Sequence, residues 1–412
     1  MNKFRNNILN EFVYIVFCIV SLVVYISLGN IIGYVICSLA LIICVYFFKG
    51  YVDLKLPISL FNYFYTFFVI VGFLVESLIR GFEFKSGTMV LFSFVFFNFF
   101  IAFRSYDRDV VELEIKNKKL INKACYFFCF LAILMSAVYF KKLGSIPLFS
   151  AELPEDRINA MTGMGYMLQP MRFGPIAALV LYLTLNEKKK RLGLFLFLIT
   201  NVCLLGTGFR GTFFQNILLF IMVKSLIEKK QINVVKSLYI GVVLISFVII
   251  IGMFRGDGTV INSLILKVAH AISVSNYILN IVVNNIFDYK YGITFFYKFT
   301  SILPIENIEY TQWLTKQLPI DFAGGVTPTV VGDMYINFGG YYWVGMIFLG
   351  LISLHLEKIA IRNDCNKILI FFIANLSLGI ARSVTGGISN TLFQTFLSGA
   401  LILVFFLISK LK

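Results

Sequence analysis

Long apolar segments alternate with short polar connections from residue 12 almost to the end of the chain. Most of these segments are about 16–20 residues long, which is the length that a helix needs to cross the hydrocarbon core of a bilayer. The pattern predicts about twelve spans, near residues 12–28, 31–48, 58–75, 89–103, 124–140, 167–185, 192–206, 212–227, 237–253, 341–356, 368–382 and 390–408. The expected fold is therefore an all-α polytopic membrane protein, with residues 1–412 as a single integral membrane domain.

The apolar pattern is interrupted for longest between residues 254 and 340, between the ninth and tenth predicted spans. Within this segment, residues 260–287 carry apolar positions at helical spacing, which predicts a helix along or within the membrane face. A shorter polar segment covers residues 141–166. We expect a functional site in these two segments, because the other connections leave little room for one.

Positive charge is distributed unevenly among the connections. The chain has 36 lysines and arginines against 21 acidic residues, a net charge of +15, and most basic residues lie in alternate connections, including 104–123, 188–191, 224–236 and 358–367. Connections rich in lysine and arginine face the cytoplasm. Both termini are therefore predicted to be cytoplasmic, and the segments 141–166 and 254–340 to face outward. This pattern explains the charge without nucleic acid and favours anionic membrane lipid as a partner.

Five arginines are predicted near the outward ends of spans: Arg157, Arg172, Arg210, Arg255 and Arg382. A guanidinium group binds phosphate oxygens through two parallel hydrogen bonds and stays charged. Several such groups at one interface predict a site for a lipid phosphate or pyrophosphate. Each arginine taken alone also fits an anchor whose long side chain reaches the interface.

Candidate acid–base groups lie on the same predicted face. Asp333 and Tyr335 flank a glycine-rich loop just before the tenth span, and His270 is the outward histidine. A histidine on an apolar stretch also fits a structural role. The sequence contains no metal-ligand spacing and no phosphate-binding glycine loop that opens a helix, so we expect neither a metal nor a cofactor.

Three short motifs resemble the Wzy-type polymerases that join O-antigen or capsule repeat units. They are Ile-Pro-Leu-Phe at 146–149 followed by Arg157, the turn from Gly208 to Arg210, and the Thr-Pro-Thr to Gly-Asp-x-Tyr-x-Asn-Phe-Gly-Gly segment over 327–340. The family commonly has a glutamate where this chain has an aspartate in the last motif. The resemblance implies a GT-C-like arrangement of about a dozen spans with a large outward loop, in the cytoplasmic (inner) membrane of a bacterium.

The resemblance also implies an activity. A growing glycan on undecaprenyl pyrophosphate is transferred to a newly flipped lipid-linked repeat unit, and a chain-length regulator is a further partner. Arginines would stabilise the departing pyrophosphate without a metal. A carboxylate or histidine, here Asp333 or His270, would accept the proton of the acceptor hydroxyl.

Two other functions stay open from the sequence. An O-antigen ligase-like transferase uses the same donor with a different acceptor. A flippase for lipid-linked sugars would place charged or broken-helix sites near the bilayer midplane. The predicted span centres are nearly free of charge, and the polar residues gather at one face, which favours a transferase.

Overall fold

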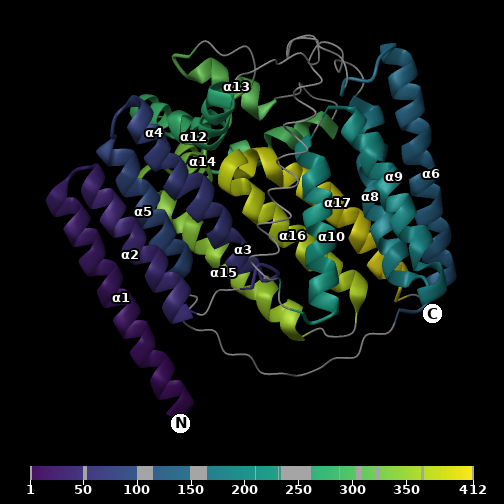
Figure 1. Cartoon of the computed structure of the whole chain (residues 1–412), viewed down its shortest axis with the longest axis horizontal. Coiled ribbons are helices and arrows are strands. Elements are labelled where there is room, and N and C mark those ends of the chain that lie inside the picture. Colours follow the sequence, from purple (N-terminus) through teal and green to yellow (C-terminus); the bar gives the residue numbers. More distant parts are fainter. Residues whose placement is uncertain are drawn as a thin grey trace. The chain divides into compact units, whose positions relative to one another are not determined.

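The computed structural model of the chain consists of helices and connections, without a strand among the residues that it describes (Figure 1). These residues are 2–49, 53–99, 115–148, 165–208, 210–230, 232, 261–286, 288–302, 309–320, 325–362 and 366–410. The predicted all-α class is confirmed for them.

Within the described residues, 5 helices are long and apolar enough to cross a membrane: Pro57–Arg80, Lys118–Leu143, Val330–Ile361, Lys367–Gly386 and Ile388–Ile408. Shorter apolar helices cover Val13–Leu28, Ile31–Tyr46, Phe84–Asn98 and Gly211–Ile227. The chain is therefore a membrane protein by the length and composition of its helices. The number of twelve spans and their sidedness stay predictions, and the predicted span 237–253 lies outside the described residues.

The chain forms two compact units. Unit 1 contains Met1–Asp107, Ile261–Ile359 and Ser377–Gln394, and unit 2 contains Arg108–Val260, Ala360–Leu376 and Thr395–Lys412. Three helices contribute residues to both units: α15 (Tyr342–Arg362), α16 (Lys367–Gly386) and α17 (Ile388–Ile408).

Besides its parts of α15, α16 and α17, unit 1 contains α1 (Asn2–Leu28), α2 (Ile31–Lys49), α3 (Pro57–Phe64), η1 (Tyr65–Val71), α4 (Gly72–Arg80), α5 (Phe84–Asn98), α12 (Ile261–Asn285), η4 (Ile293–Ile302), α13 (Tyr310–Gln317), α14 (Val330–Phe338) and η5 (Gly339–Tyr341). Helices α1 and α2 lie side by side, as Figure 1 shows in purple. The helix predicted over 260–287 is confirmed as α12.

The span Pro57–Arg80 contains a π-helical stretch, η1, between α3 and α4. A π-helical turn disturbs the regular ladder of backbone hydrogen bonds, so side chains can reach its carbonyl groups. Asn276 Nδ2 of α12 donates to the carbonyl oxygen of Phe68 at 2.9 Å, and the Tyr34 hydroxyl donates to that of Ile70 at 3.1 Å. These two bonds connect the π-helical stretch to α12 and α2.

The motif over 327–340 is helical where we expected a glycine-rich loop. Helix α14 begins after Thr329, whose hydroxyl accepts a hydrogen bond from the Gly332 N–H at 3.4 Å, and it ends at Gly339, which has a φ of 56°. A threonine at the first position and a glycine with positive φ at the last are strong helix boundaries. The residues between them therefore present polar side chains from a regular helix.

In unit 2 the helices are α6 (Lys118–Leu143), α8 (Gly165–Thr184), η3 (Glu187–Lys189), α9 (Lys190–Gly206) and α10 (Arg210–Ile227). Helix α8 packs against both α6 and α9. A Cβ atom on Gly174 of α8 would lie only 2.5 Å from the Cβ of Ala132 and 3.1 Å from Thr200. The missing side chain therefore allows the three helices to approach closely, as small residues do in membrane proteins.

Candidate functional site

Asp333 is the centre of a buried polar network in unit 1. Its side chain has no exposed surface, and both carboxylate oxygens accept hydrogen bonds. Oδ1 accepts from the Tyr310 hydroxyl at 2.8 Å and from Ser389 Oγ at 2.7 Å, while Oδ2 accepts from the Ser389 N–H at 2.8 Å. A buried carboxylate is costly unless donors surround it. Here the donors come from α13 and from the start of α17.

The first turn of α17 is shaped around this carboxylate. Gly387 separates α16 from α17 with a φ of 69°, and a Cβ atom there would lie 3.0 Å from Asp333 Oδ2. Only glycine adopts this left-handed conformation at low cost and leaves the space free. Asp333 therefore lies at the N-terminus of α17, where exposed N–H groups and the helix dipole favour a negative charge.

One turn further along α14, Asn337 extends the network to η4. Its Oδ1 accepts hydrogen bonds from the Gly292 N–H and from the Thr294 hydroxyl, both at 3.0 Å. Thr294 Oγ1 and Ser389 Oγ are 2.7 Å apart. We call Asp333, Asn337, Thr294, Tyr310 and Ser389 the Asp333 network, and all five are buried.

Tyr310 is held in its protonated form. Burial, together with the nearby Asp333 carboxylate, raises the pKa of Tyr310 well above its usual value. The phenol therefore stays a hydrogen-bond donor to Asp333 over the whole physiological pH range.

The residues next to two network members form a more exposed group. Glu309 precedes Tyr310 and Asn390 follows Ser389. Lys298 of η4 lies between them: its Nζ is 3.3 Å from Glu309 Oε1 and donates a hydrogen bond to Asn390 Oδ1. Side-chain exposure is 39% for Glu309 and 14% for Lys298. By holding Tyr310 and Ser389, Asp333 thus positions the neighbouring Glu309 and Asn390.

An aromatic cluster adjoins this group. The Trp313 ring lies 5.3 Å from the Tyr297 ring at 81° and 6.0 Å from the Tyr310 ring at 27°. Trp313 is half-buried, so part of its surface stays accessible. A partly exposed aromatic face beside charged and amide groups suits a sugar, which has apolar C–H faces and polar hydroxyl edges.

Two further cations flank the connection between α4 and α5, Arg80 at the end of α4 and Lys85 in the first turn of α5. Arg80 forms an ion pair with Glu76 at 2.5 Å and lies 4.2 Å from the centre of the Tyr277 ring. Lys85 donates to the Val283 carbonyl oxygen at 2.9 Å. Both are outward residues in the predicted topology, and the sequence analysis did not select either of them.

Two of the three predicted acid–base residues, Asp333 and Tyr335, lie on α14 but make different contacts. Asp333 belongs to the network. The Tyr335 ring packs against the Tyr289 ring at 5.7 Å, and Lys85 Nζ lies 5.7 Å from the centre of the Tyr335 ring. His270 is exposed on α12, and no described hydrogen bond of Asp333 involves it. Their catalytic roles stay predictions.

The predicted arginine clamp is described only in part. Arg172 is partly buried on α8, and Arg210 is the first residue of α10, both in unit 2. Arg157 and Arg255 lie outside the described residues. A common pyrophosphate site for these arginines therefore stays a prediction.

Sequence reasoning missed Tyr310, Ser389, Lys298, Glu309 and Asn390. The available signals were the Gly-Gly break before Ser389 and the tryptophan in an otherwise polar stretch beside Glu309. Among the described residues, no group of three histidine, cysteine or acidic side chains is placed to hold a metal ion.

Comparison with known proteins adds no family to this geometry. Neither a family model, nor a curated protein, nor a solved structure matches the chain.

Proposed function

We propose that the protein is a membrane glycosyltransferase that joins lipid-linked oligosaccharide repeat units on the outer face of the cytoplasmic membrane. One observation carries this proposal: the partly exposed Lys298–Glu309 pair is held in place by the buried Asp333 network and adjoins Trp313. Every one of these residues belongs to a segment that the charge pattern assigns to the outside. A polar, aromatic-lined group at this face suits a glycan whose lipid anchor stays in the bilayer.

The proposed reaction is a displacement at the anomeric carbon of the donor. Glu309 accepts the proton of the acceptor hydroxyl, and the hydroxyl oxygen forms the new glycosidic bond. The bond between the anomeric carbon and the phosphate oxygen breaks, and undecaprenyl pyrophosphate leaves with the bonding electrons. Lys298 orients Glu309 through their ion pair.

Asp333 acts in this proposal as a positioning residue. Its carboxylate is buried and already accepts hydrogen bonds on both oxygens, so it has no surface through which to reach an acceptor hydroxyl. The departing pyrophosphate needs positive charge. From the sequence alone, Arg157, Arg172, Arg210 and Arg255 are the proposed pyrophosphate-binding residues. The reaction needs no nucleotide, because the sugar–phosphate bond supplies the driving force.

The repeat-unit polymerase is the preferred form of this activity, because of the resemblance of the segment over 327–340. A ligase-like transferase would use the same donor site with a different acceptor. In both forms the protein is a multi-pass protein of the bacterial inner membrane with cytoplasmic termini.

Deletion of the gene tests the proposal in cells. We expect the surface polysaccharide to be reduced to single repeat units, visible as a loss of the ladder on a gel. The wild-type chain should restore the ladder, and a Glu309→Gln variant at equal protein level should not. If even single repeat units were absent from the outer face, the result would contradict the transferase proposal and favour a flippase.

A further inference from the structure

A cavity in unit 2 is lined by basic residues that the proposed reaction does not use. Its volume is about 570 Å³, and its walls contain Ile115, Lys118, Leu183, Thr184, Leu185, Asn186, Glu187, Lys190 and Lys367. This volume is within the range of roughly 300–1,000 Å³ that is usual for small-molecule sites. We call it the lysine cavity.

The three lysines come from three helices, and each one is the first residue of its helix. Lys118 begins α6, Lys190 begins α9 and Lys367 begins α16. A helix N-terminus carries partial positive charge from its exposed N–H groups, so a cation there is electrostatically unfavourable. In the lysine cavity three helix-starting lysines surround one space, and the effect is weakest for Lys190, because the 3-10 turn η3 precedes it and its N–H donates to the Asn186 carbonyl oxygen.

The cavity wall holds little negative charge to offset these cations. Glu187 is the one carboxylate among the described residues of the wall, and it pairs with Lys190. Neither Lys118 nor Lys367 has a carboxylate partner among the residues that the structure describes. Within the part of the chain that the structure describes, two of the three lysines are therefore left without a compensating charge.

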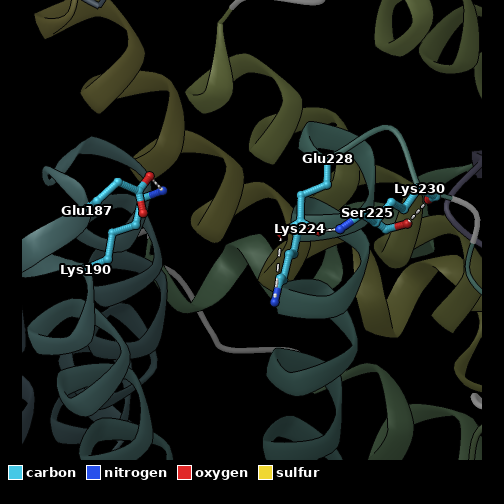
Figure 2. A network of polar contacts seen from close by, with 6 residues as sticks. All are labelled: Glu187, Lys190, Lys224, Ser225, Glu228 and Lys230. Carbon is cyan, nitrogen blue, oxygen red and sulfur yellow. Dashed lines mark hydrogen bonds and ion pairs between the residues drawn. The ribbon is translucent and has the colours of Figure 1, made fainter.

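A group at the end of α10 and in the residues that follow it shows the contrasting case (Figure 2). Glu228 pairs with Lys230 at 3.0 Å and with Lys224 at 3.9 Å. Lys230, and to a smaller extent Lys224, hold the pKa of Glu228 below its usual value. Lys224 and Lys230 thus have an acidic partner among the described residues, whereas Lys118 and Lys367 have none there.

We propose that the lysine cavity binds the phosphate headgroup of an anionic phospholipid of the cytoplasmic leaflet. The charge pattern assigns all three connections that line it to the cytoplasmic side, where such lipids are available. Lys118, Lys190 and Lys367 contact the phosphate oxygens. Ile115, Leu183 and Leu185 provide an apolar wall for the glycerol and the first acyl carbons. This site is independent of the proposed glycan transfer.

The test measures thermal unfolding of the purified full-length protein in neutral phosphatidylcholine micelles, with and without added phosphatidylglycerol. We expect phosphatidylglycerol to raise the unfolding temperature of the wild type by about 5 °C. The cavity variant, Lys118→Gln with Lys190→Gln and Lys367→Gln, should lose this rise. In phosphatidylcholine alone it should unfold no earlier than the wild type, because two cations without a described acidic partner are removed and the exposed Lys190–Glu187 pair contributes little.

A matched control removes the same charge from the same surface. Lys188→Gln with Lys189→Gln and Arg191→Gln changes three exposed cations that do not line the cavity. The control should keep the rise with phosphatidylglycerol. Equal loss in both triple variants would mean non-specific attraction and would overturn the proposal. An equal rise with millimolar inorganic phosphate in place of lipid would also overturn it, in favour of a site for free phosphate.

Discussion

The Asp333 network and the lysine cavity are both polar regions assembled from helix ends, but their charges are treated in opposite ways. In the network a buried anion lies at a helix N-terminus and accepts hydrogen bonds from Tyr310 and Ser389. In the cavity, cations lie at three helix N-termini and two of them lack an acidic partner among the described residues. The network is electrostatically complete without a ligand, whereas the cavity is completed by one.

This difference implies that the Asp333 network contributes to stability, whereas the lysine cavity contributes to ligand binding. A satisfied buried charge fixes the positions of the elements around it, and its removal leaves donors without partners. An uncompensated charged surface lowers stability until a ligand of opposite charge arrives. The two regions should therefore respond oppositely to the removal of their charges.

Asp333→Ala should have the largest effect. The hydroxyl of Tyr310 and the N–H of Ser389 would lose their acceptor in a buried site, at a cost of about 3–5 kcal/mol in the free energy of unfolding. Denaturant unfolding of the purified protein measures this loss. Tyr335→Phe, which removes a hydroxyl from the same helix outside the network, is the control and should change the free energy far less. An equal loss of unfolding free energy in Asp333→Ala and Tyr335→Phe would contradict a special role of the Asp333 network in stability.

Gly387→Ala should have an intermediate effect. An alanine there is strained by a φ of 69°, and its Cβ would also lie 3.0 Å from Asp333 Oδ2. Gly144 offers a matched control, since it has a φ of 71° and a Cβ added there would meet no atom within 4 Å. Both variants bear a backbone cost of about 1–2 kcal/mol. We expect the crowding to cost Gly387→Ala about 1–3 kcal/mol more, and similar unfolding curves would refute the close packing on Asp333.

Glu187→Gln should have the smallest effect on stability. Its side chain is 84% exposed, and exposed ion pairs contribute about 0–1 kcal/mol. The substitution also removes the acidic group from the cavity wall. Affinity for phosphatidylglycerol, measured by titration of the unfolding temperature, should therefore rise slightly. Weaker lipid binding would show that Glu187 orients Lys190 rather than competing for it.

The sequence was sufficient to predict the helical class and the helix over 260–287. Those predictions rest on local patterns: apolar length and helical spacing. The partners of Asp333 could not be predicted, because Tyr310 and Ser389 are 23 and 56 residues away. A buried carboxylate requires donors, but the sequence does not say which segments supply them.

Other features depend on the fold in a similar way. The π-helical stretch η1 could not be predicted from the local sequence. One of its carbonyl groups, that of Phe68, accepts a hydrogen bond from Asn276, which is 208 residues away in the chain. The Lys298–Glu309 pair was missed because its two charges are separated along the chain and come together only when α13 packs near η4. The apparent loop over 327–340 was misjudged because its glycines lie mainly at the ends of α14.

The central claim is that Asp333 holds the neighbouring residues in position, whereas Glu309 accepts the proton of the acceptor hydroxyl. Single-turnover transfer by the purified protein, with a lipid-linked repeat unit as donor and acceptor, tests it directly when each variant's unfolding temperature is measured in the same preparation. Glu309→Gln should lower the transfer rate by roughly 10²–10⁴-fold at an unchanged unfolding temperature. Asp333→Asn should lower the unfolding temperature and keep most of the rate in the protein that remains folded. A folded but inactive Asp333→Asn beside a fully active Glu309→Gln would contradict the account.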